Sequence, residues 1–393
     1  MTIAQKIRSA MEQSSWIRKM FEEGARLKTQ FGSANVYDFS IGNPNLPPPE
    51  KFSEVLRDTV DSCGLGDHCY MPQSGYPQVC RSIADYLTGE QGVPVSENDV
   101  AMTCGAAGAL NVILKTLLDP GDEVILTIPV FVDYGAYVDN HGGIPRLVPC
   151  HPDFTLNLEA IAGAVTDKTK AVIINSPNNP SGQIYSAESL QALGRLLADK
   201  GRAYDRTIYL ISDEPYRKIV FDGHQVPSIF KAYSESFIAT SYSKDLSIPG
   251  ERIGFAAINP QARFKDDIIV GMKLANRILG FINAPALMQR VVSCLQGLSV
   301  DMNEYLRKRD LLCEGLADAG YDFVKPKGSF YLFPRTPIAD DVEFVKALQQ
   351  EMILTVPGVG FKCPGYFRIA FCVSDETIVH AMPGFKRVMD KYR

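Results

Sequence analysis

The sequence contains no long hydrophobic run, and its first residues do not have the pattern of a secretion signal. No apolar segment in its 393 residues approaches the roughly 20 residues that a membrane-spanning helix needs, even at 171–174 or 208–211. The first residues also lack the continuous apolar core of a signal peptide. From these features we expect no membrane association and no export.

Cysteine patterning and blocks of one charge are also missing. The nine cysteines are scattered without a C-x-x-C pair, which favours reduced thiols and predicts a cytoplasmic protein. The 40 basic and 45 acidic side chains are spread along the chain, with a net charge of −5, so nucleic acid is not an expected partner. The missing G-x-G-x-x-G motif argues against a nicotinamide-dependent oxidoreductase.

Strand-like apolar runs alternate with helical patterns through the middle of the chain. This alternation predicts an α/β fold, in which a mostly parallel, seven-stranded sheet is flanked by helices. The expected strands are 100–103, 123–128, 146–148, 171–175, 207–212, 237–241 and 252–258. We expect a large α/β domain over 49–286. Residues 1–48 and 287–393 would form an N-terminal arm and a smaller α+β domain.

The two ends of the chain differ from the middle. The first residues predict a short amphipathic helix, interrupted near 13–15 and resumed through Lys28. The C-terminal part predicts helices over 301–319 and 341–352, a strand over 366–371, and a last helix from Asp375. Pro383 should kink or interrupt that last helix, because proline lacks the backbone N–H that an α-helix uses.

Three polar side chains, those of Asn179, Asp213 and Lys244, follow the ends of three expected strands. In a mostly parallel sheet, ligands bind at the carboxyl ends of the strands. The three side chains are therefore expected at one edge of one sheet, where they would share a site.

Lys244 closes the motif S-Y-S-K, and P-G-E-R-I-G follows it at 249–254. A lysine whose pKa is lowered by burial or by a nearby cation offers a neutral amine that can form a Schiff base. Ser241 and Ser243, two residues apart, could both donate hydrogen bonds to a phosphate that Arg252 also binds. A serine-rich turn with a surface ion pair remains the alternative interpretation.

Two further segments carry weaker signals. The small residues of C-G-A-A-G-A at 104–109 join an expected strand to an expected helix, whose first N–H groups at Gly105, Ala106 and Ala107 would face an anion. Close packing of helix on sheet explains the same residues equally well. Phe131 could stack on a flat cofactor ring or belong to the hydrophobic core.

Asp213 and Arg368 are charged groups next to or inside apolar strands. A carboxylate beside a pyridine nitrogen keeps that nitrogen protonated, and Asn179 and Tyr216 could bind the ring's phenolic oxygen. Asp213 would otherwise cap a helix. A buried arginine such as Arg368 needs an anion, supplied by a protein acid or by a substrate carboxylate. Together these groups indicate pyridoxal phosphate (PLP) held by Lys244.

With these motifs in order, together with S-P-N-N-P-S-G at 176–182 and S-D-E-P-Y at 212–216, the chain resembles the class I/II aminotransferases of PLP fold type I, the aspartate aminotransferase family. The resemblance implies a PLP-dependent transaminase that moves the α-amino group of an L-amino acid to a 2-oxo acid by a ping-pong mechanism, without a metal. It implies a homodimer with shared active sites, to which Tyr70 contributes by reaching the neighbouring subunit's phosphate.

The resemblance also implies the role of each site residue. Catalysis would use Lys244, Asp213 and Tyr216, and Gly42, Asn179 and Arg368 would bind the substrate. The residues implied to bind PLP are Tyr70, Gly105, Ala106, Ala107, Phe131, Asn179, Asp213, Tyr216, Ser241, Ser243, Lys244 and Arg252.

The chain departs from the family pattern at positions that affect specificity. Many members have tryptophan where this chain has Phe131, and some have lysine where it has Ala107. Arg277 is a candidate for reading the substrate side chain, and the preferred amino acid stays open. Two alternatives also stay open on the same fold: a PLP-dependent β-lyase acting on cystathionine or cysteine conjugates, and a non-catalytic PLP-binding regulatory protein.

Overall fold

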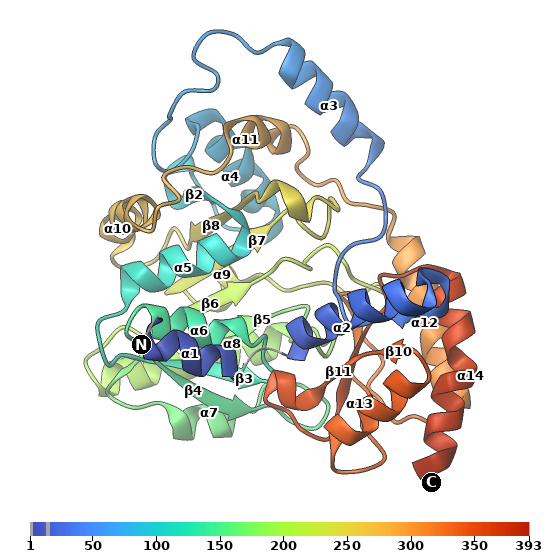
Figure 1. Cartoon of the computed structure of the whole chain (residues 1–393). Coiled ribbons are helices and arrows are strands. Elements are labelled where there is room, and N and C mark those ends of the chain that lie inside the picture. Colours follow the sequence, from blue (N-terminus) through green and yellow to red (C-terminus); the bar gives the residue numbers. More distant parts are fainter. Residues whose placement is uncertain (1–2, 13–15, 393) are drawn as a thin grey trace.

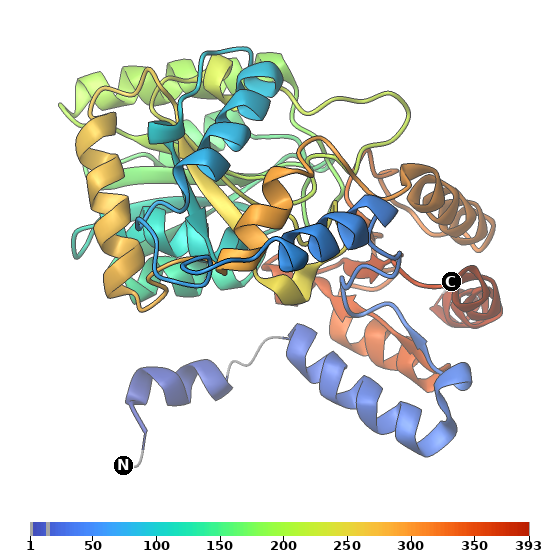
Figure 2. The ribbon, with the colours of Figure 1, turned by 90° about the horizontal axis from the view of Figure 1, so that it is seen from above.

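The structure is a computed structural model that describes residues 3–12 and 16–392. A layered α/β body carries a smaller group of helices and strands, and the chain enters through α1 (Gln5–Glu12) and α2 (Trp16–Phe31) (Figure 1). The expected break near 13–15 lies outside the described residues. Figure 2 shows α1 outside the layered body, and Lys6 of α1 forms an ion pair with Asp139.

The body is built on a seven-stranded sheet with the order β2-β8-β7-β6-β5-β3-β4. β8 is antiparallel to both its neighbours, and the other adjacent strands are parallel, which confirms the predicted fold class. The strands are β2 (Val100–Thr103), β3 (Glu123–Ile128), β4 (Ile144–Pro149), β5 (Thr169–Asn175), β6 (Tyr209–Asp213), β7 (Ser236–Ser241) and β8 (Gly254–Ile258).

Helices cover both faces of this sheet because its strands are apolar on both sides. In β3, Val124 and Leu126 pack with α5, α6 and α10, whereas Ile125 packs with the helices of the other face. The first face carries α5 (Gly105–Leu117), α6 (Asp133–Asn140) and α10 (Lys265–Ile278). The second carries α4 (Pro77–Gln91), α7 (Leu158–Ala164), α8 (Ala187–Ala203), α9 (Ile229–Ala232) and α11 (Ala286–Ser293), beside α3 (Glu50–Asp61).

Local sequence explains where α8 begins. Ser186 caps the helix by accepting a hydrogen bond from the Ser189 N–H, at 3.1 Å, and Glu188 lies in the first turn, where the helix dipole favours an anion. Leu190, Leu193 and Leu197 recur at helical spacing and are buried.

The smaller group holds a three-stranded antiparallel sheet, β11-β12-β9, and a parallel pair, β1 with β10. Its strands are β1 (Tyr37–Asp38), β9 (Tyr331–Leu332), β10 (Ile353–Leu354), β11 (Val356–Pro357) and β12 (Phe367–Ala370). Its helices are α12 (Met302–Asp318), α13 (Asp341–Gln350) and α14 (Asp375–Tyr392). The short 3₁₀ helices of the chain are η1 (Ser33–Asn35), η2 (Glu97–Asp99), η3 (Pro249–Glu251) and η4 (Gly358–Phe361).

Of the two expected effects of Pro383, a kink or an interruption of the last helix, the interruption is wrong. α14 runs continuously through Pro383. Its buried residues Ile378, Ala381, Phe385 and Val388 lie on both sides of the proline and join the core that α14 shares with α12 and α13. This packing outweighs the loss of one backbone hydrogen bond.

The division into 49–286 and the remainder stays a prediction. α11, just after that boundary, packs through Met288, Val291 and Val292 into the core of the sheet's second face. None of the helices within the described residues has both the length and the apolar character to cross a membrane.

Candidate active site

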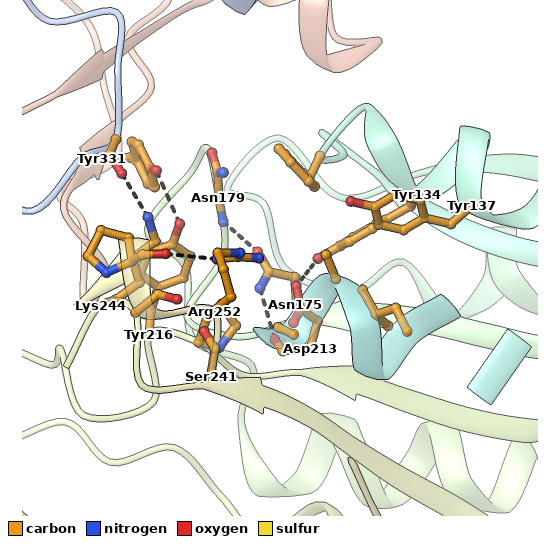
Figure 3. A pocket seen from close by; sticks show the side chains of 18 of the residues that line it. Tyr134, Tyr137, Asn175, Asn179, Asp213, Tyr216, Ser241, Lys244, Arg252 and Tyr331 are labelled. Atoms are coloured by element: carbon orange, nitrogen blue, oxygen red, sulfur yellow. Dashed lines mark hydrogen bonds between the residues drawn. The ribbon is translucent and has the colours of Figure 1, made fainter. Parts of the chain in front are cut away.

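A cavity of about 300 Å³ lies at the carboxyl ends of β5, β6 and β7 and reaches the smaller group of strands and helices (Figure 3). It brings together the ends of three strands, as the sequence predicted for Asn179, Asp213 and Lys244. The residues that line it are Gly42, Ala106, Ala107, Leu110, Phe131, Tyr134, Tyr137, Asn175, Asn179, Asp213, Pro215, Tyr216, Ser241, Ser243, Lys244, Pro249, Arg252, Tyr331 and Arg368.

Lys244 follows β7 and is half-buried in the cavity. Its Nζ donates a hydrogen bond to the Gly42 carbonyl oxygen, at 2.8 Å. Burial lowers the pKa of the Lys244 ammonium to about 8, and Arg368 and Arg252 also lower it. Roughly half of the amine is therefore uncharged near pH 8, and the uncharged form is the one that acts as a nucleophile.

Asp213 is the last residue of β6, and its carboxylate is buried with one free oxygen. Oδ2 accepts a short hydrogen bond from the Tyr134 hydroxyl, while Oδ1 has no partner. Burial raises the pKa of the carboxyl to about 7, although the Tyr134 hydrogen bond lowers it. An unpaired buried acceptor is costly, so Oδ1 suits a ligand with a protonated nitrogen.

Small residues and donors form another part of the cavity. Ser241 and Ser243 are buried there, and no side chain caps the start of α5, so its first N–H groups stay available near Ala106 and Ala107. Gly105 does not line the cavity itself. It has a φ of +74°, which favours glycine, and a Cβ there would lie 3.0 Å from Nη2 of Arg252, so the residue also leaves room for the guanidinium. This arrangement of donors suits a phosphate.

Arg368, on β12, is a buried guanidinium that pairs with none of the described acidic side chains. Nη1 donates to Asn179 Oδ1 at 3.1 Å, and Nη2 donates to the Ser40 carbonyl oxygen at 2.6 Å. Nε, also buried, has no partner. Because an arginine binds a carboxylate through two N–H groups, this one is suited to a carboxylate that the ligand supplies.

Sequence reasoning missed four polar side chains that line the cavity, those of Tyr134, Tyr137, Asn175 and Tyr331, besides Leu110, Pro215 and Pro249. Tyr134 and Tyr137 are three residues apart, a helical spacing that could have placed both on one side of α6. Asn175 donates a hydrogen bond to the Asp213 carbonyl oxygen at 2.9 Å. This contact joins two neighbouring strands, and no local sequence motif predicts it.

Besides Gly105, two residues with predicted roles lie outside the cavity. The Tyr70 side chain is 88% exposed, and Arg277 is exposed in the last turn of α10. Their predicted roles need a second subunit, so both stay predictions.

Comparison with known proteins gives consistent matches over nearly the whole chain. The model of the family described as "Aminotransferase class I and II" matches residues 34–384. The chain is 31% identical over 359 residues to the aspartate/prephenate aminotransferase of Thermus thermophilus, with 90% of each chain covered. It is 31% identical over 377 residues to the aspartate aminotransferase of Thermotoga maritima, covering 93% of this chain and 95% of that one.

Solved structures match as closely. The crystal structure of an amino transferase from Eubacterium rectale superimposes with a TM-score of 0.97, at 37% sequence identity, and each chain is covered completely. An aspartate aminotransferase from Thermus thermophilus with maleate superimposes with a TM-score of 0.87 at 27% identity, over 99% of this chain and 100% of that one.

Proposed function

Because the chain belongs to the class I and II aminotransferases, we propose that Lys244, Asp213 and Arg368 carry out transamination of an aspartate-like amino acid in a shared dimeric site. The enzyme class itself follows from the family: the protein is a PLP-dependent transaminase that moves the α-amino group of an L-amino acid to a 2-oxo acid by a ping-pong mechanism. The residue roles, the substrate and the assembly are the proposal.

The residues of the cavity fit PLP on three observations. The free Oδ1 of Asp213 would pair with the protonated ring nitrogen. The start of α5, with Ser241, Ser243 and Arg252, would hold the phosphate. The lowered pKa of Lys244 supports a Schiff base between its Nζ and the cofactor.

When bound, PLP supplies an electron sink for the negative charge that develops at the substrate's α-carbon. The protein's part is to orient the substrate and to move the proton. Arg368 would hold the α-carboxylate, together with Asn179, its hydrogen-bond partner. Once the amino acid has displaced Lys244 from the cofactor, the free amine of Lys244 would take the proton from the substrate's α-carbon and deliver it to a carbon atom of the cofactor. Its pKa of about 8 suits both the acceptance and the release of a proton.

Phe131 and Tyr216 complete the proposed cofactor site. Phe131, which lines the cavity after β3, would stack on the ring. Tyr216 is buried, and its hydroxyl lies 3.1 Å from that of Tyr331, within the cavity where it would bind the phenolic oxygen with Asn179. Gly42 would lie beside the substrate, since its carbonyl oxygen already contacts Lys244.

An aspartate-like substrate is supported by the names of the relatives, several of which are aspartate or aspartate/prephenate aminotransferases. The described residues that line the cavity include three cations, Lys244, Arg252 and Arg368, and all three already have proposed roles. The second carboxylate, on the substrate side chain, would therefore be bound by a residue that does not line this cavity. Our candidate is Arg277 of the partner subunit.

A half-reaction screen tests the function. The PLP-loaded protein is mixed with single amino acids, and absorbance loss of the lysine-bound cofactor is followed without an acceptor. We expect one equivalent of 2-oxo acid per site with aspartate, and continued turnover only after an acceptor 2-oxo acid is added. Sustained release of pyruvate and ammonia from cystathionine without an acceptor would instead assign a β-lyase.

A homodimer is supported by an apolar surface next to the exposed Tyr70. On α10, Val270, Leu274 and Ile278 are spaced by four residues and are 66%, 54% and 59% exposed, which forms one apolar stripe along the helix. Asn276, on the buried face of the same helix, donates a hydrogen bond to the Gln73 carbonyl oxygen at 3.1 Å, so α10 itself contacts the loop that carries Tyr70.

We expect the double variant Leu274→Glu/Ile278→Glu to be monomeric. Two carboxylates in the stripe would have to be desolvated in a dimer, so light scattering should report the chain mass of 43.3 kDa rather than twice that value. Val379→Glu on α14, where the side chain is 50% exposed, is the matched control and should leave the mass unchanged. A monomeric wild-type protein, or a dimeric double variant, would contradict the proposed assembly.

We also propose that the enzyme works in the cytoplasm, which its nine free thiols support.

We propose in addition that the chain divides into a large domain over 49–286 and a smaller unit from 1–48 and 287–393. In support, the core of the second unit is largely separate and centres on residues such as Leu312, Phe344 and Phe385.

A further inference from the structure

Two aromatic rings enclose the guanidinium of Arg368. Its Cζ lies 4.6 Å from the centre of the Tyr331 ring and 4.9 Å from that of Phe361. All three residues are buried. A guanidinium this close to two aromatic rings gains a cation–π interaction with each of them. Arg368 lacks an acidic partner among the described residues, so these rings and two hydrogen bonds hold it.

Tyr331 also contacts two other parts of the cavity. Its hydroxyl lies 3.1 Å from the Tyr216 hydroxyl, and a Cβ on Gly42 would lie 1.7 Å from the Tyr331 oxygen. Residue 42 must therefore stay glycine while Tyr331 holds this position. Tyr331 comes from β9, whose pairing of Tyr331 with Ala370 on β12 sets it beside Arg368.

We propose that Tyr331 is a positioning residue with two separable parts: its ring holds Arg368 for the substrate carboxylate, and its hydroxyl orients the Tyr216 hydroxyl. This inference rests on the proposed roles of Arg368 and Tyr216. If Tyr331 only filled space, removing its ring and removing its hydroxyl would not affect different steps. In the proposed arrangement, loss of the ring weakens carboxylate binding, and loss of the hydroxyl slows turnover.

The test compares Tyr331→Leu with Tyr331→Phe in the PLP-loaded protein. Loss of the ring in Tyr331→Leu should raise KM for the amino acid about 10-fold, within the range of a buried cation–π contact. It should weaken by a similar factor the binding of a carboxylic acid that has no amino group and cannot react. Tyr331→Phe keeps the ring, so carboxylate affinity should stay within about 2-fold of wild type, while kcat falls about 3- to 10-fold, as for a lost hydrogen bond.

Two controls separate this effect from unfolding. Tyr366→Leu removes a ring that stacks on Arg335, with Cζ 5.4 Å from the ring centre and outside the cavity, and should leave carboxylate affinity unchanged. Inorganic phosphate should bind each cofactor-free variant as it binds wild type, because Ser241, Ser243 and Arg252 are untouched.

The outcomes distinguish the inference from the function on which it rests. Arg368→Leu must lose carboxylate affinity; if it does not, the proposed role of Arg368 fails. If Arg368→Leu behaves as expected but Tyr331→Leu binds the carboxylic acid as wild type does, the ring has no such role. An unchanged kcat in Tyr331→Phe would remove the role of the hydroxyl.

Discussion

Lys244→Ala is expected to lose transamination by about 10⁴-fold or more, because one change removes both the amine that binds the cofactor and the proposed base for the α-proton. The measurement is single-turnover formation of 2-oxo acid from the PLP-loaded variant. Reduction with borohydride should attach the cofactor to Lys244 of the wild-type protein and to no residue of the variant, which tests the Schiff base separately from activity.

Lys346→Ala is a suitable control, since Lys346 is an exposed lysine of α13 and its loss should leave turnover unchanged. Lys244→Arg should fail like the alanine variant, because arginine keeps its charge and stays protonated in proteins. A Lys244→Ala protein with wild-type turnover would overturn the assignment of this lysine.

Asp213→Asn is expected to lower the affinity for PLP and to raise the stability of the cofactor-free protein. Without its carboxylate, the site loses the charged partner of the ring nitrogen, a loss of about 2–5 kcal/mol for a buried charge pair. PLP should then dissociate about 30- to 5,000-fold more readily. The cofactor-free variant should nevertheless melt at a higher temperature than cofactor-free wild type at pH 8, because no carboxylate must be buried there without a cation.

The sign of the pH dependence follows from the raised pKa. The Asp213 carboxyl ionises near 3.8 in the unfolded chain and near 7 in the folded one. Between these values the folded state binds more protons, so cofactor-free wild type loses stability as pH rises from about 4 to 7. The melting-temperature advantage of Asp213→Asn should grow across that window and then level off. Asp85→Asn, on the exposed side of α4, should show neither change.

If the Asp213→Asn variant bound PLP as tightly as wild type, Asp213 would not be the partner of the ring nitrogen. A variant that was less stable than wild type at every pH would show that the buried carboxylate does not destabilise the cofactor-free fold.

Features that depend on local sequence were predictable. Apolar runs such as 123–128 identify buried strands, and a polar residue that directly follows one must lie at the sheet's edge. Asn179, Asp213 and Lys244 could therefore be placed at one edge of the sheet from the sequence alone. The boundaries of 100–103 and 123–128 are confirmed, and those of the other strands differ by one or two residues. Asp213 is the last residue of β6 rather than the first after it.

Features that depend on contacts between distant segments were not predictable. Tyr331 reaches the cavity because β9 pairs with β12, and nothing near residue 331 indicates this. The hydrogen bond from Tyr134 to Asp213 joins residues on α6 and β6, and sequence spacing gives only the side of α6 on which Tyr134 lies. Pro383 shows the reverse case, in which a strong local signal is overridden by burial on both sides.

β8, the one strand that runs against the others in the large sheet, keeps the two proposed cofactor contacts, Lys244 and Arg252, on one short connection of the chain. A parallel neighbour of β7 would start at the opposite edge and need a crossover of a dozen or more residues. β8 runs antiparallel to β7, so the chain leaves β7 at Ser241, passes Lys244 and Arg252, and enters β8 at Gly254 without leaving that edge. The distance between the lysine and the arginine is thus set within one connection. Arg368, the proposed carboxylate contact, comes from β12 of the smaller group of helices and strands, so the position of the carboxylate contact is set separately from the positions of the two cofactor contacts.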